Sequence, residues 1–564
     1  MDVKHEAPAA MTIEKVESGG DSGRSSQDDP THGENKVTFS FFMTMVGMCL
    51  AFVVAEITPL FLVTCFTIIA ADLNALDKII WILTAPYIAT GAVAPFVGNL
   101  SDLIGRRGIL LLSLVLVIVA FILQGAAPNI ATFLVGGVLA GAAIGIQILV
   151  VIAAASELVP MHKRGATIGY LAMGLIPFAA APLYGQSIAA TNWRFIYLLL
   201  GLIAVLAFIV LAIFYKPPPR PASQLSKMQL LARIDYIGCL LSISGVVLFL
   251  VGINFGGQDY AWNSGVVIAC LTSGLALLVI FGIYEKWIVK YPMFPARLIQ
   301  KKRHFFAVSV LCLTSGVNFV PLTVFWTIQT FSVYGANFSD AGRWLMPLGF
   351  CIIGGAGISA VLISLFRKRI MWILLGFCIM QTVGIACLAT FDPQNINSVW
   401  APMVFGLIGV GAVLLPSQVV FSVISPDDLI GTSVALSVVI RMIGQVIGKS
   451  MFYNIFKQTV TRNAYDIIPG PAVAVGFFSI PRITSLVTYM GAGPLRFYVD
   501  RGVFPEITRL DALPQLITAG QQVYAKSFPI LYLLSIPWGV LAVFSCLLLY
   551  GVDQYIDEHV AVHM

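Results

Sequence analysis

A short polar stretch separates two long apolar segments near the start of the chain and reads Gly98-Asn99-Leu100-Ser101-Asp102-Leu103-Ile104-Gly105-Arg106-Arg107. The apolar segments on either side cover residues 79–99 and 108–127. Each is long enough to cross a bilayer, which takes ~20 apolar residues in helical form. We therefore expect this stretch to be a tight turn between two transmembrane helices.

The residue types of the stretch suit such a turn. Gly98 and Gly105 allow a sharp change of direction or a close approach of two backbones. Asp102 lies near helix ends, where a carboxylate can accept from backbone N–H groups or pair with a base. Arg106 and Arg107 are basic residues of the kind that mark the cytoplasmic face of a membrane protein.

The composition excludes a water-soluble protein. The chain has 564 residues, of which 58% are hydrophobic and 11% are charged, whereas soluble domains average ~45–50% apolar and ~25% charged residues. So few charges cannot cover the surface of a soluble protein of this length, and we expect a polytopic protein in a lipid bilayer. The net charge of +6 is spread over short loops and forms no basic patch, so no nucleic-acid partner is expected.

Counting apolar segments predicts an all-α protein with fourteen transmembrane helices. They are expected near 40–68, 79–99, 108–127, 131–154, 165–189, 194–215, 234–255, 264–285, 304–330, 343–366, 370–390, 399–423, 430–456 and 528–551. Pro59 in the first segment is a point where that helix could tilt or break.

The distribution of basic residues predicts the orientation. Lys and Arg concentrate in one alternate set of loops, whereas the short loops of the other set carry only Lys78, Arg194 and Arg343. By the positive-inside rule both termini lie in the cytoplasm. Asn337 begins an Asn-Phe-Ser sequon in an outside loop and is a glycosylation candidate.

The expected domain organisation follows from these segments. Disordered or short cytoplasmic tails are expected at the two ends, the disordered one at 1–38 and the second at 553–564. Two six-helix bundles are expected at 39–215 and 304–552, and the extra helix pair with its linkers is expected between them at 216–303. Within the second bundle, 457–527 is expected to be a long external segment that lies partly on the membrane or re-enters it.

The order Gly-x-Leu-x-Asp-x-x-Gly-Arg-Arg resembles the loop motif between the second and third helices of major facilitator superfamily transporters. A degenerate copy at 364–369, which lacks the acid, follows the second helix of the C-terminal half. Two related halves are how facilitator transporters are built. The resemblance implies that Gly98, Asp102, Gly105 and Arg106 form a conformational latch.

Further stretches resemble the fungal branch of fourteen-helix drug:proton antiporters. Gly174, Pro177, Pro182 and Gly185 resemble the Gly/Pro-rich motif of antiporter-type facilitators in the fifth helix. The stretches at 235–238 and 256–264 resemble the extra helix pair of that branch, while those at 441–448, 453–456 and 524–528 resemble trichothecene efflux pumps and siderophore–iron transporters. The resemblance covers about 40–560.

One departure concerns proton coupling. Antiporters of this type usually carry an Arg in the fourth helix within an Arg-x-x-Gln-Gly pattern, but this chain has Gly137-Val138-Leu139-Ala140-Gly141 there. The proton-coupling group must therefore be sought among other buried ionisable residues.

Glu56 and Arg441 stand out among the ionisable residues inside predicted spans, where a charge costs at least ~2.5–3.5 kcal/mol on insertion scales. Glu56 has three interpretations: a proton carrier, a partner for a cationic substrate group, or half of a fixed ion pair. Arg441 is followed on the same helical face by Gln445 and, one turn further, by Gly448 and Lys449. This face either lines a cavity and contacts substrate oxygens or belongs to a packing interface. Whether Glu56 and Arg441 meet is left open by the sequence.

Five uncharged candidates also lie on apolar spans: Gln147, Asn318, Gln329, Gln418 and Trp326. They are candidates for lining a pocket for a bulky ligand through hydrogen bonds and stacking. The alternative for each is a contact between helices.

The function expected from these observations is proton-coupled efflux of small organic toxins, secondary metabolites or drugs by a monomeric transporter. The alternative within the same fold is uptake of ferric siderophores. A transporter-like nutrient sensor is disfavoured by the short C-terminal tail. No metal site, cofactor or enzymatic activity is expected, because no convergent set of catalytic or metal-ligating residues is visible. The expected location is the plasma membrane, with the vacuolar membrane as the alternative.

Overall fold

The computed structural model describes residues 39–158, 170–216, 235–289, 292–294, 296–366, 369–426, 429–477, 482–507 and 509–555. The chain divides into a unit Met1–Phe39 and a unit Ser40–Met564, and the described residues belong to the second unit, apart from Phe39. The expected tail 1–38 and most of the expected tail 553–564 therefore lie outside the described residues.

Fourteen helical spans of the described chain are long and apolar enough to cross a membrane, as the sequence predicted. The first six comprise α1 (Phe39–Asp72), α2 (Ile79–Ile104), α3 (Arg106–Gly125), α4 (Ile130–Glu157), a broken span with η2 (Ile176–Phe178) and α6 (Ala181–Asn192), and α7 (Arg194–Phe214). The short turn η1 (Leu76–Lys78) connects α1 to α2, and the extra pair is α9 (Tyr236–Phe255) with α10 (Gly265–Trp287).

The last six spans form the C-terminal half. They comprise α11 (Lys302–Val320) with η4 (Pro321–Phe325) and α12 (Trp326–Ser332), α13 (Phe338–Leu365), α14 (Ile370–Cys387) with η6 (Leu388–Thr390), α15 (Asn397–Ile424), α16 (Ile430–Ile467), and α20 (Leu513–Leu534) with α21 (Ile536–Leu547). Shorter helices and turns are η3 (Ala296–Ile299), α17 (Pro469–Ala474), α18 (Ile483–Ala492), α19 (Leu495–Asp500) and η9 (Val552–Tyr555).

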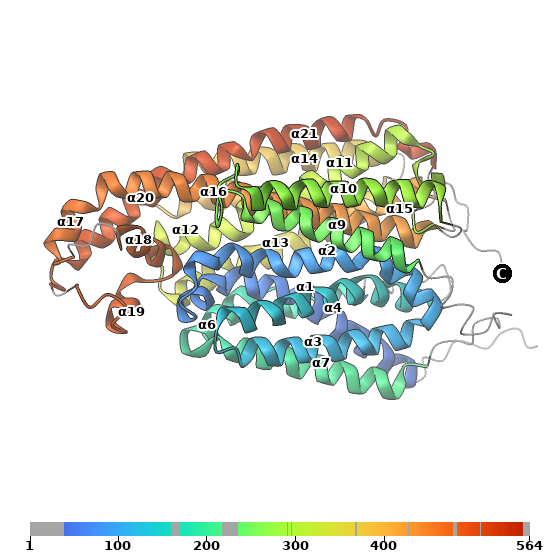
Figure 1. Cartoon of the computed structure of the whole chain (residues 1–564), viewed down its shortest axis with the longest axis horizontal. Coiled ribbons are helices and arrows are strands. Elements are labelled where there is room, and N and C mark those ends of the chain that lie inside the picture. Colours follow the sequence, from blue (N-terminus) through green and yellow to red (C-terminus); the bar gives the residue numbers. More distant parts are fainter. Residues whose placement is uncertain are drawn as a thin grey trace, which may run out of the picture. The chain divides into compact units, whose positions relative to one another are not determined.

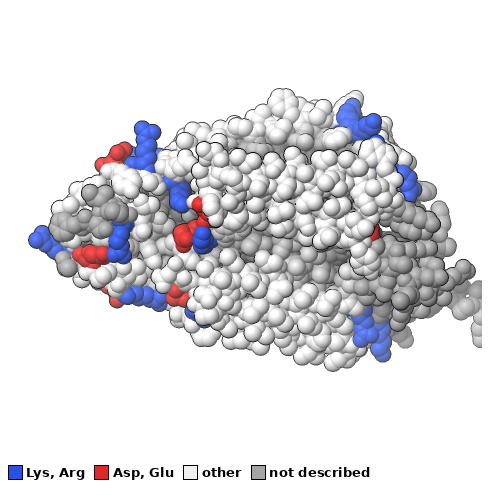
Figure 2. Space-filling view, viewed as in Figure 1, with Lys and Arg blue, Asp and Glu red and all other residues white. Residues whose placement is uncertain are grey.

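The helices are held together by apolar packing and present apolar side chains outward. Leu275, Val279 and Ile283 on α10 are about half exposed, which suits contact with lipid chains rather than water. Figure 2 shows the same property on one face, where Lys, Arg, Asp and Glu lie toward the two ends and the wide band between them carries almost none. This band is the surface expected to face the hydrocarbon core.

The two halves meet mainly through α2, which packs against both α4 and α16, and through α13, which packs against α6 (Figure 1). The α2–α4 contact is close because Gly141 of α4 has no Cβ. An added Cβ there would run into the backbone carbonyl of Pro86 on α2. Small residues at such contacts allow membrane helices to approach closely and gain dispersion energy.

The extra helix pair is attached to both halves. Asn254 of α9 donates to the hydroxyl of Thr84 on α2 and accepts from the hydroxyl of Ser450 on α16 at 2.5 Å. In the α9–α10 connection, Asp259 pairs with Lys78 at 2.5 Å and accepts from the indole of Trp81 at 2.8 Å. Burial opposes ionisation of Asp259, but these hydrogen bonds outweigh it and hold the pKa of its carboxyl below the usual value.

The ninth span differs from the single helix expected at 304–330. It begins at Lys302 and continues to Ser332, but it is interrupted by a π-helical turn over Pro321–Phe325. Proline has no backbone N–H and its ring clashes with the carbonyl one turn earlier, so the α-helical ladder cannot pass through Pro321 unchanged.

The last two spans are longer than the sequence predicted. The helix expected at 430–456 continues to Ile467, and the helix expected at 528–551 begins already at Leu513. Between them α17 and α18 pack with the extensions of α16 and α20, and α19 packs with α18 (Figure 1). Hydropathy marks only the part of a helix that matches bilayer thickness, whereas buried residues such as Leu516 and Val523 stabilise the extension by packing.

Candidate functional site

A cavity of about 160 Å³ lies between the two halves. The first half contributes α1, α2, α4 and the broken span, and the second contributes α11 with η4, α13, α15 and α16. Most of its wall is apolar, with side chains such as Leu60, Ile144, Phe319, Leu348 and Met442. A concave, mostly apolar space with a few polar groups is the usual form of a small-molecule site.

The polar groups of this cavity come from both halves. The first half contributes Glu56 of α1 together with Tyr87 and Thr90 of α2. The second half contributes Arg441 and Gln445 of α16. The charges of Glu56 and Arg441 are close enough to interact, yet no ion pair within 4.0 Å joins these two described residues. The structure therefore brings the two predicted ionisable residues together without a direct contact.

Several buried polar atoms on the α16 side of the cavity have no protein partner. Within the described chain, Nε and Nη1 of Arg441 and Oε1 of Gln445 make no hydrogen bond, although Arg441 is only 6% exposed. Buried donors and acceptors are normally satisfied, and leaving one unpaired costs about 1–3 kcal/mol. These atoms are therefore available to a bound molecule or to water.

The glycines of α16 orient Arg441 toward the cavity. An added Cβ at Gly444 would run into the carbonyl of Leu313 on α11, and one at Gly448 would lie 3.1 Å from the Cα of Val317. This glycine side of α16 packs on α11, so the neighbouring positions 441 and 445 face the cavity. Arg441 and Gln445 lie on nearly the same face of α16 as these glycines, so the two interpretations that the sequence left open, cavity wall and packing interface, apply to adjacent parts of that face.

Lys449 continues the polar stripe of α16 one turn beyond Gln445, and the structure buries this cation. It is 1% exposed, its Nζ donates to the carbonyl of Leu83 on α2 at 3.1 Å, and it lies 3.1 Å from the centroid of the Tyr87 ring. A cation over an aromatic face is attracted by the ring quadrupole. Its spacing of four residues from Gln445 places it on the same polar stripe, as the sequence predicted.

The uncharged candidates lie outside the set of described residues that line the cavity. Trp326 is buried, donates from its indole to the carbonyl of Trp344 at 3.1 Å and packs against Trp400. Gln147 and Asn318 are fully buried, and their amide groups make no hydrogen bond within the described chain. The geometry thus places Trp326 in a packing cluster and not in the wall of the cavity.

Comparison with known proteins gives the family. The sequence pattern described as Major Facilitator Superfamily matches residues 37–448. This chain belongs to the major facilitator superfamily. It is therefore a multi-pass membrane protein of a transporter family, as the loop motif and the fourteen spans predicted.

The curated relatives include fungal efflux pumps. Trichothecene efflux pump TRI12 of Fusarium sporotrichioides is 25% identical over 486 residues, which cover 82% of this chain and 78% of the relative. Efflux pump FUS6 of Gibberella moniliformis is 25% identical over 542 residues, which cover 93% of this chain and 90% of the relative.

Solved structures of transporters share the fold. A bacterial homologue of the human lysosomal transporter Spinster superposes with a TM-score of 0.57 at 14% identity, covering 92% of this chain and 98% of that one. A transporter of the POT family gives a TM-score of 0.53 at 14% identity and covers 83% of this chain and 96% of that one. The expected facilitator fold is confirmed.

The superfamily's loop motif forms the expected turn. Ile104 ends α2, Arg106 begins α3, and Gly105 between them has φ +99°, a left-handed conformation that favours glycine. Arg107 donates to the carbonyl of Ala212 on α7 at 2.7 Å. The side chain of Asp102 and the surroundings of Gly98 lie outside the described residues, so the latch role stays a prediction.

The Gly/Pro-rich motif breaks the fifth span where it approaches α1. An added Cβ at Gly174 would run into Cys49, and one at Gly185 would lie 3.0 Å from the Phe61 ring. Pro177 lies in η2 and Pro182 in the first turn of α6, where proline is tolerated because the first N–H groups of a helix have no intrahelical partner.

Asn337 is exposed and caps α13, with its side-chain oxygen accepting from the N–H of Asp340 at 2.8 Å. This position remains a glycosylation candidate. In the part of the chain that the structure describes, no group of three metal-ligating side chains lies together.

Proposed function

We propose that this protein is a proton-coupled exporter of small organic molecules, in which substrate and proton compete for Glu56 in the central cavity. The observation that carries the proposal is the placement of Glu56 and Arg441, one from each half, on the same cavity without an ion pair. The fungal efflux pumps among its relatives support export as the direction.

The cavity supports a division of roles among its polar groups. The ionised carboxylate of Glu56 accepts hydrogen bonds from a hydroxyl or amine of the substrate. The unpaired guanidinium atoms of Arg441 donate to substrate oxygens, as charge-assisted bonds about twice as strong as neutral ones. Apolar walls hold the body of the molecule.

Protonation of Glu56 then releases the substrate. A protonated carboxyl has lost its negative charge and much of its strength as an acceptor, so a proton and a substrate donor exclude each other. Such competition couples inward proton movement to outward substrate movement, provided that the cavity opens to one side at a time.

The contact between α2 and α16 supports alternating access by relative movement of the two halves. Lys449 belongs to the second half, but its ammonium is held by Leu83 and Tyr87 of the first. Separating α2 from α16 breaks both contacts and exposes the cation to water. We propose that the loop motif at 98–107 acts as a conformational latch at the other end of α2.

We further propose that the protein works as a monomer in the plasma membrane with both termini in the cytoplasm, and that it has no enzymatic activity. The distribution of basic residues over alternate loops supports the orientation. The fold and the relatives, which are transporters, support transport in place of catalysis.

Transport in cells tests the proposal. Cells expressing the full chain are loaded with a labelled toxin, either a trichothecene or an aromatic carboxylic acid, and retention is measured with and without a proton uncoupler. We expect cells with the wild type to retain less toxin than cells without the protein. The uncoupler or Glu56→Gln should reduce this export at least about tenfold, the loss expected for one charge-assisted interaction.

Glu285→Gln is the matched control, because Glu285 on α10 accepts from the backbone of Met293 and Phe294 and lies outside the cavity. Its export should equal that of the wild type. Export that survives Glu56→Gln unchanged would exclude Glu56 as the coupling site. Accumulation of a ferric hydroxamate in place of toxin export would show the uptake function instead.

A further inference from the structure

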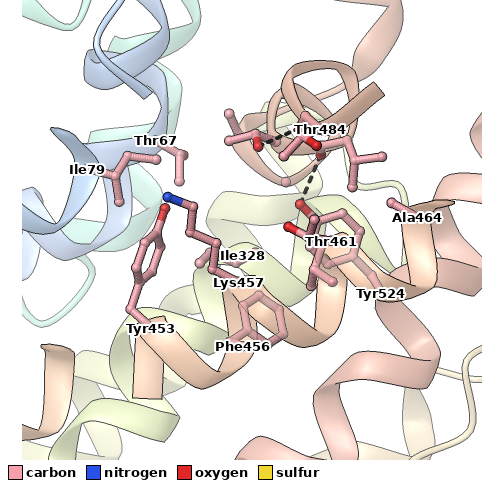
Figure 3. A pocket seen from close by; sticks show the side chains of 15 residues that line it. Thr67, Ile79, Ile328, Tyr453, Phe456, Lys457, Thr461, Ala464, Thr484 and Tyr524 are labelled. Atoms are coloured by element: carbon pink, nitrogen blue, oxygen red, sulfur yellow. Dashed lines mark hydrogen bonds between the residues drawn. The ribbon is translucent and has the colours of Figure 1, made fainter. Parts of the chain in front are cut away.

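A second, smaller cavity of about 50 Å³ lies near the end of the helices where η1 connects α1 to α2 (Figure 3). Its walls come from α1, α2, α12, α16, α18 and α20. One side is apolar and includes Ile79, Ile328 and the rings of Phe456 and Tyr524. The other side carries polar groups, including the hydroxyls of Thr67 and Tyr453 and the ammonium of Lys457.

The polar side of this cavity has unused hydrogen-bonding groups. Thr67 is 1% exposed, and its hydroxyl makes no hydrogen bond within the described chain. In Figure 3 the Lys457 ammonium points toward the hydroxyl of Tyr453 and the side chain of Thr67. An unpaired buried hydroxyl is costly unless a bound molecule or water satisfies it.

The carboxylates nearest to Lys457 do not neutralise it. Asp259 interacts with Lys457 electrostatically, but its oxygens are hydrogen-bonded to Lys78 and Trp81. Asp77, which lies near Tyr453, is 71% exposed. No ion pair within 4.0 Å joins Lys457 to another described residue, so its donors are available to an anion that enters the cavity.

The two cavities lie along one ridge of α16. Arg441, Gln445, Lys449, Tyr453 and Lys457 recur at every fourth position, and residues at this spacing are neighbours on a helix surface. The first two line the central cavity, the last two line the second cavity, and Lys449 between them is covered by α2. The ridge spans roughly 24 Å at ~1.5 Å per residue.

We propose that the second cavity is a release site for the exported molecule and that it binds a compound with an apolar or aromatic body and a carboxylate. Lys457, Tyr453 and Thr67 bind the carboxylate, while Phe456, Tyr524 and Ile328 contact the body. The assignment as a release site rests on the proposed export function, with the α1–α2 end facing outward. Separation of α2 from α16 at Lys449 connects the two cavities.

Photolabelling of the purified full chain in lipid nanodiscs tests the site without a proton gradient. The probes are 4-azidobenzoate and its neutral analogue 4-azidobenzamide, and labelled residues are mapped by mass spectrometry. We expect azidobenzoate to label α16 near 453–461 and α18 near 484–491, with competition by benzoate. Lys457→Gln should reduce this labelling about tenfold, the loss expected for one charge-assisted hydrogen bond.

Lys526→Gln is the matched control, because Lys526 is exposed on α20 and does not line the cavity. The Lys526→Gln variant should be labelled by azidobenzoate to the same extent as the wild type. Equal labelling by both probes, or labelling unaffected by Lys457→Gln, would overturn the proposal. Labelling confined to the central cavity around Arg441 would also overturn it while leaving the export function intact. Loss of coupling in Glu56→Gln is measured separately and does not depend on this site.

Discussion

At the scale of single residues, Lys449 is the least expected feature of this protein. A cation that is 1% exposed loses its hydration, and the structure provides one carbonyl and one aromatic ring in return. Burying a charge without an opposite charge beside it costs free energy, and an apolar side chain of similar volume removes that cost. We therefore expect Lys449 to be needed for movement between states and not for stability.

Lys449→Met tests this expectation. The Tm of the purified variant should equal or exceed that of the wild type, whereas export should fall, because the contact between Lys449 and the first half is lost. Both quantities are measured on the same preparation, by thermal unfolding and by transport after reconstitution. A Tm lowered by several degrees with normal transport would show a purely structural role.

At the scale of helices, the contact between α2 and α4 depends on one missing Cβ. Gly141 lies against the carbonyl of Pro86, while Gly137 one turn earlier has more room, with its added Cβ 3.5 Å from the Pro86 ring. Both glycines belong to the same apolar helix, and their sequence context is alike.

The two glycines predict opposite results. Gly141→Ala should destabilise the protein by about 1–3 kcal/mol, because rigid backbone must move to accommodate the methyl group. Gly137→Ala should be neutral or slightly stabilising, since alanine favours helix by about 1 kcal/mol over glycine. Tm measurements on the pair check this, and equal Tm values would contradict the α2–α4 packing.

The α9–α10 pair predicts a pH dependence. The pKa of Asp259 is held below its usual value by hydrogen bonds that outweigh the opposing effect of burial. Its contribution to stability is therefore fully present above the unfolded pKa of about 4 and is lost as the pH falls through the lower folded pKa.

Asp259→Asn should accordingly lower the Tm at pH 7, and the difference from the wild type should shrink as the pH falls below about 4. Asp500→Asn is the control, because Asp500 is 64% exposed and its nearest cation is 4.0 Å away. Its Tm should follow the wild type at every pH. A Tm difference for Asp259→Asn that does not change with pH would exclude ionisation of Asp259 as the cause.

At the scale of the whole molecule, transport by moving halves requires α2 and α16 to separate. An added Cβ at Gly91 would lie 3.4 Å from the Cβ of Met442, close to the Cβ–Cβ distance of ~3.5–4.5 Å in disulfides. Gly91→Cys combined with Met442→Cys should form a disulfide on oxidation and abolish transport, and reduction should restore it.

The disulfide is best made in a Cys378→Ala background, because the sulfurs of Cys378 and Cys546 lie 3.4 Å apart and can also react. Each single cysteine variant under the same oxidant is the control. Transport that continues with the disulfide formed would rule out separation of α2 and α16 at this level.

Much of the fold and part of the candidate site could be predicted from the sequence. The turn at Gly105 and the fourteen spans follow from local composition, and Glu56 and Arg441 stand out because charges in apolar segments are costly. The positions of Trp326, Gln147 and Asn318 could not be predicted, because a polar or aromatic residue on a buried helix is equally compatible with a cavity and with a helix contact.

The sequence alone determined that this chain is a fourteen-helix facilitator, since spanning a bilayer requires long apolar helices and the loop motif is local. Only the tertiary structure decided that Glu56 and Arg441 face one cavity, that Lys449 is held by the opposite half, and that Thr67 and Lys457 share a second cavity. These residues are far apart along the chain, and their meeting depends on how glycine faces and proline breaks set the packing of helices.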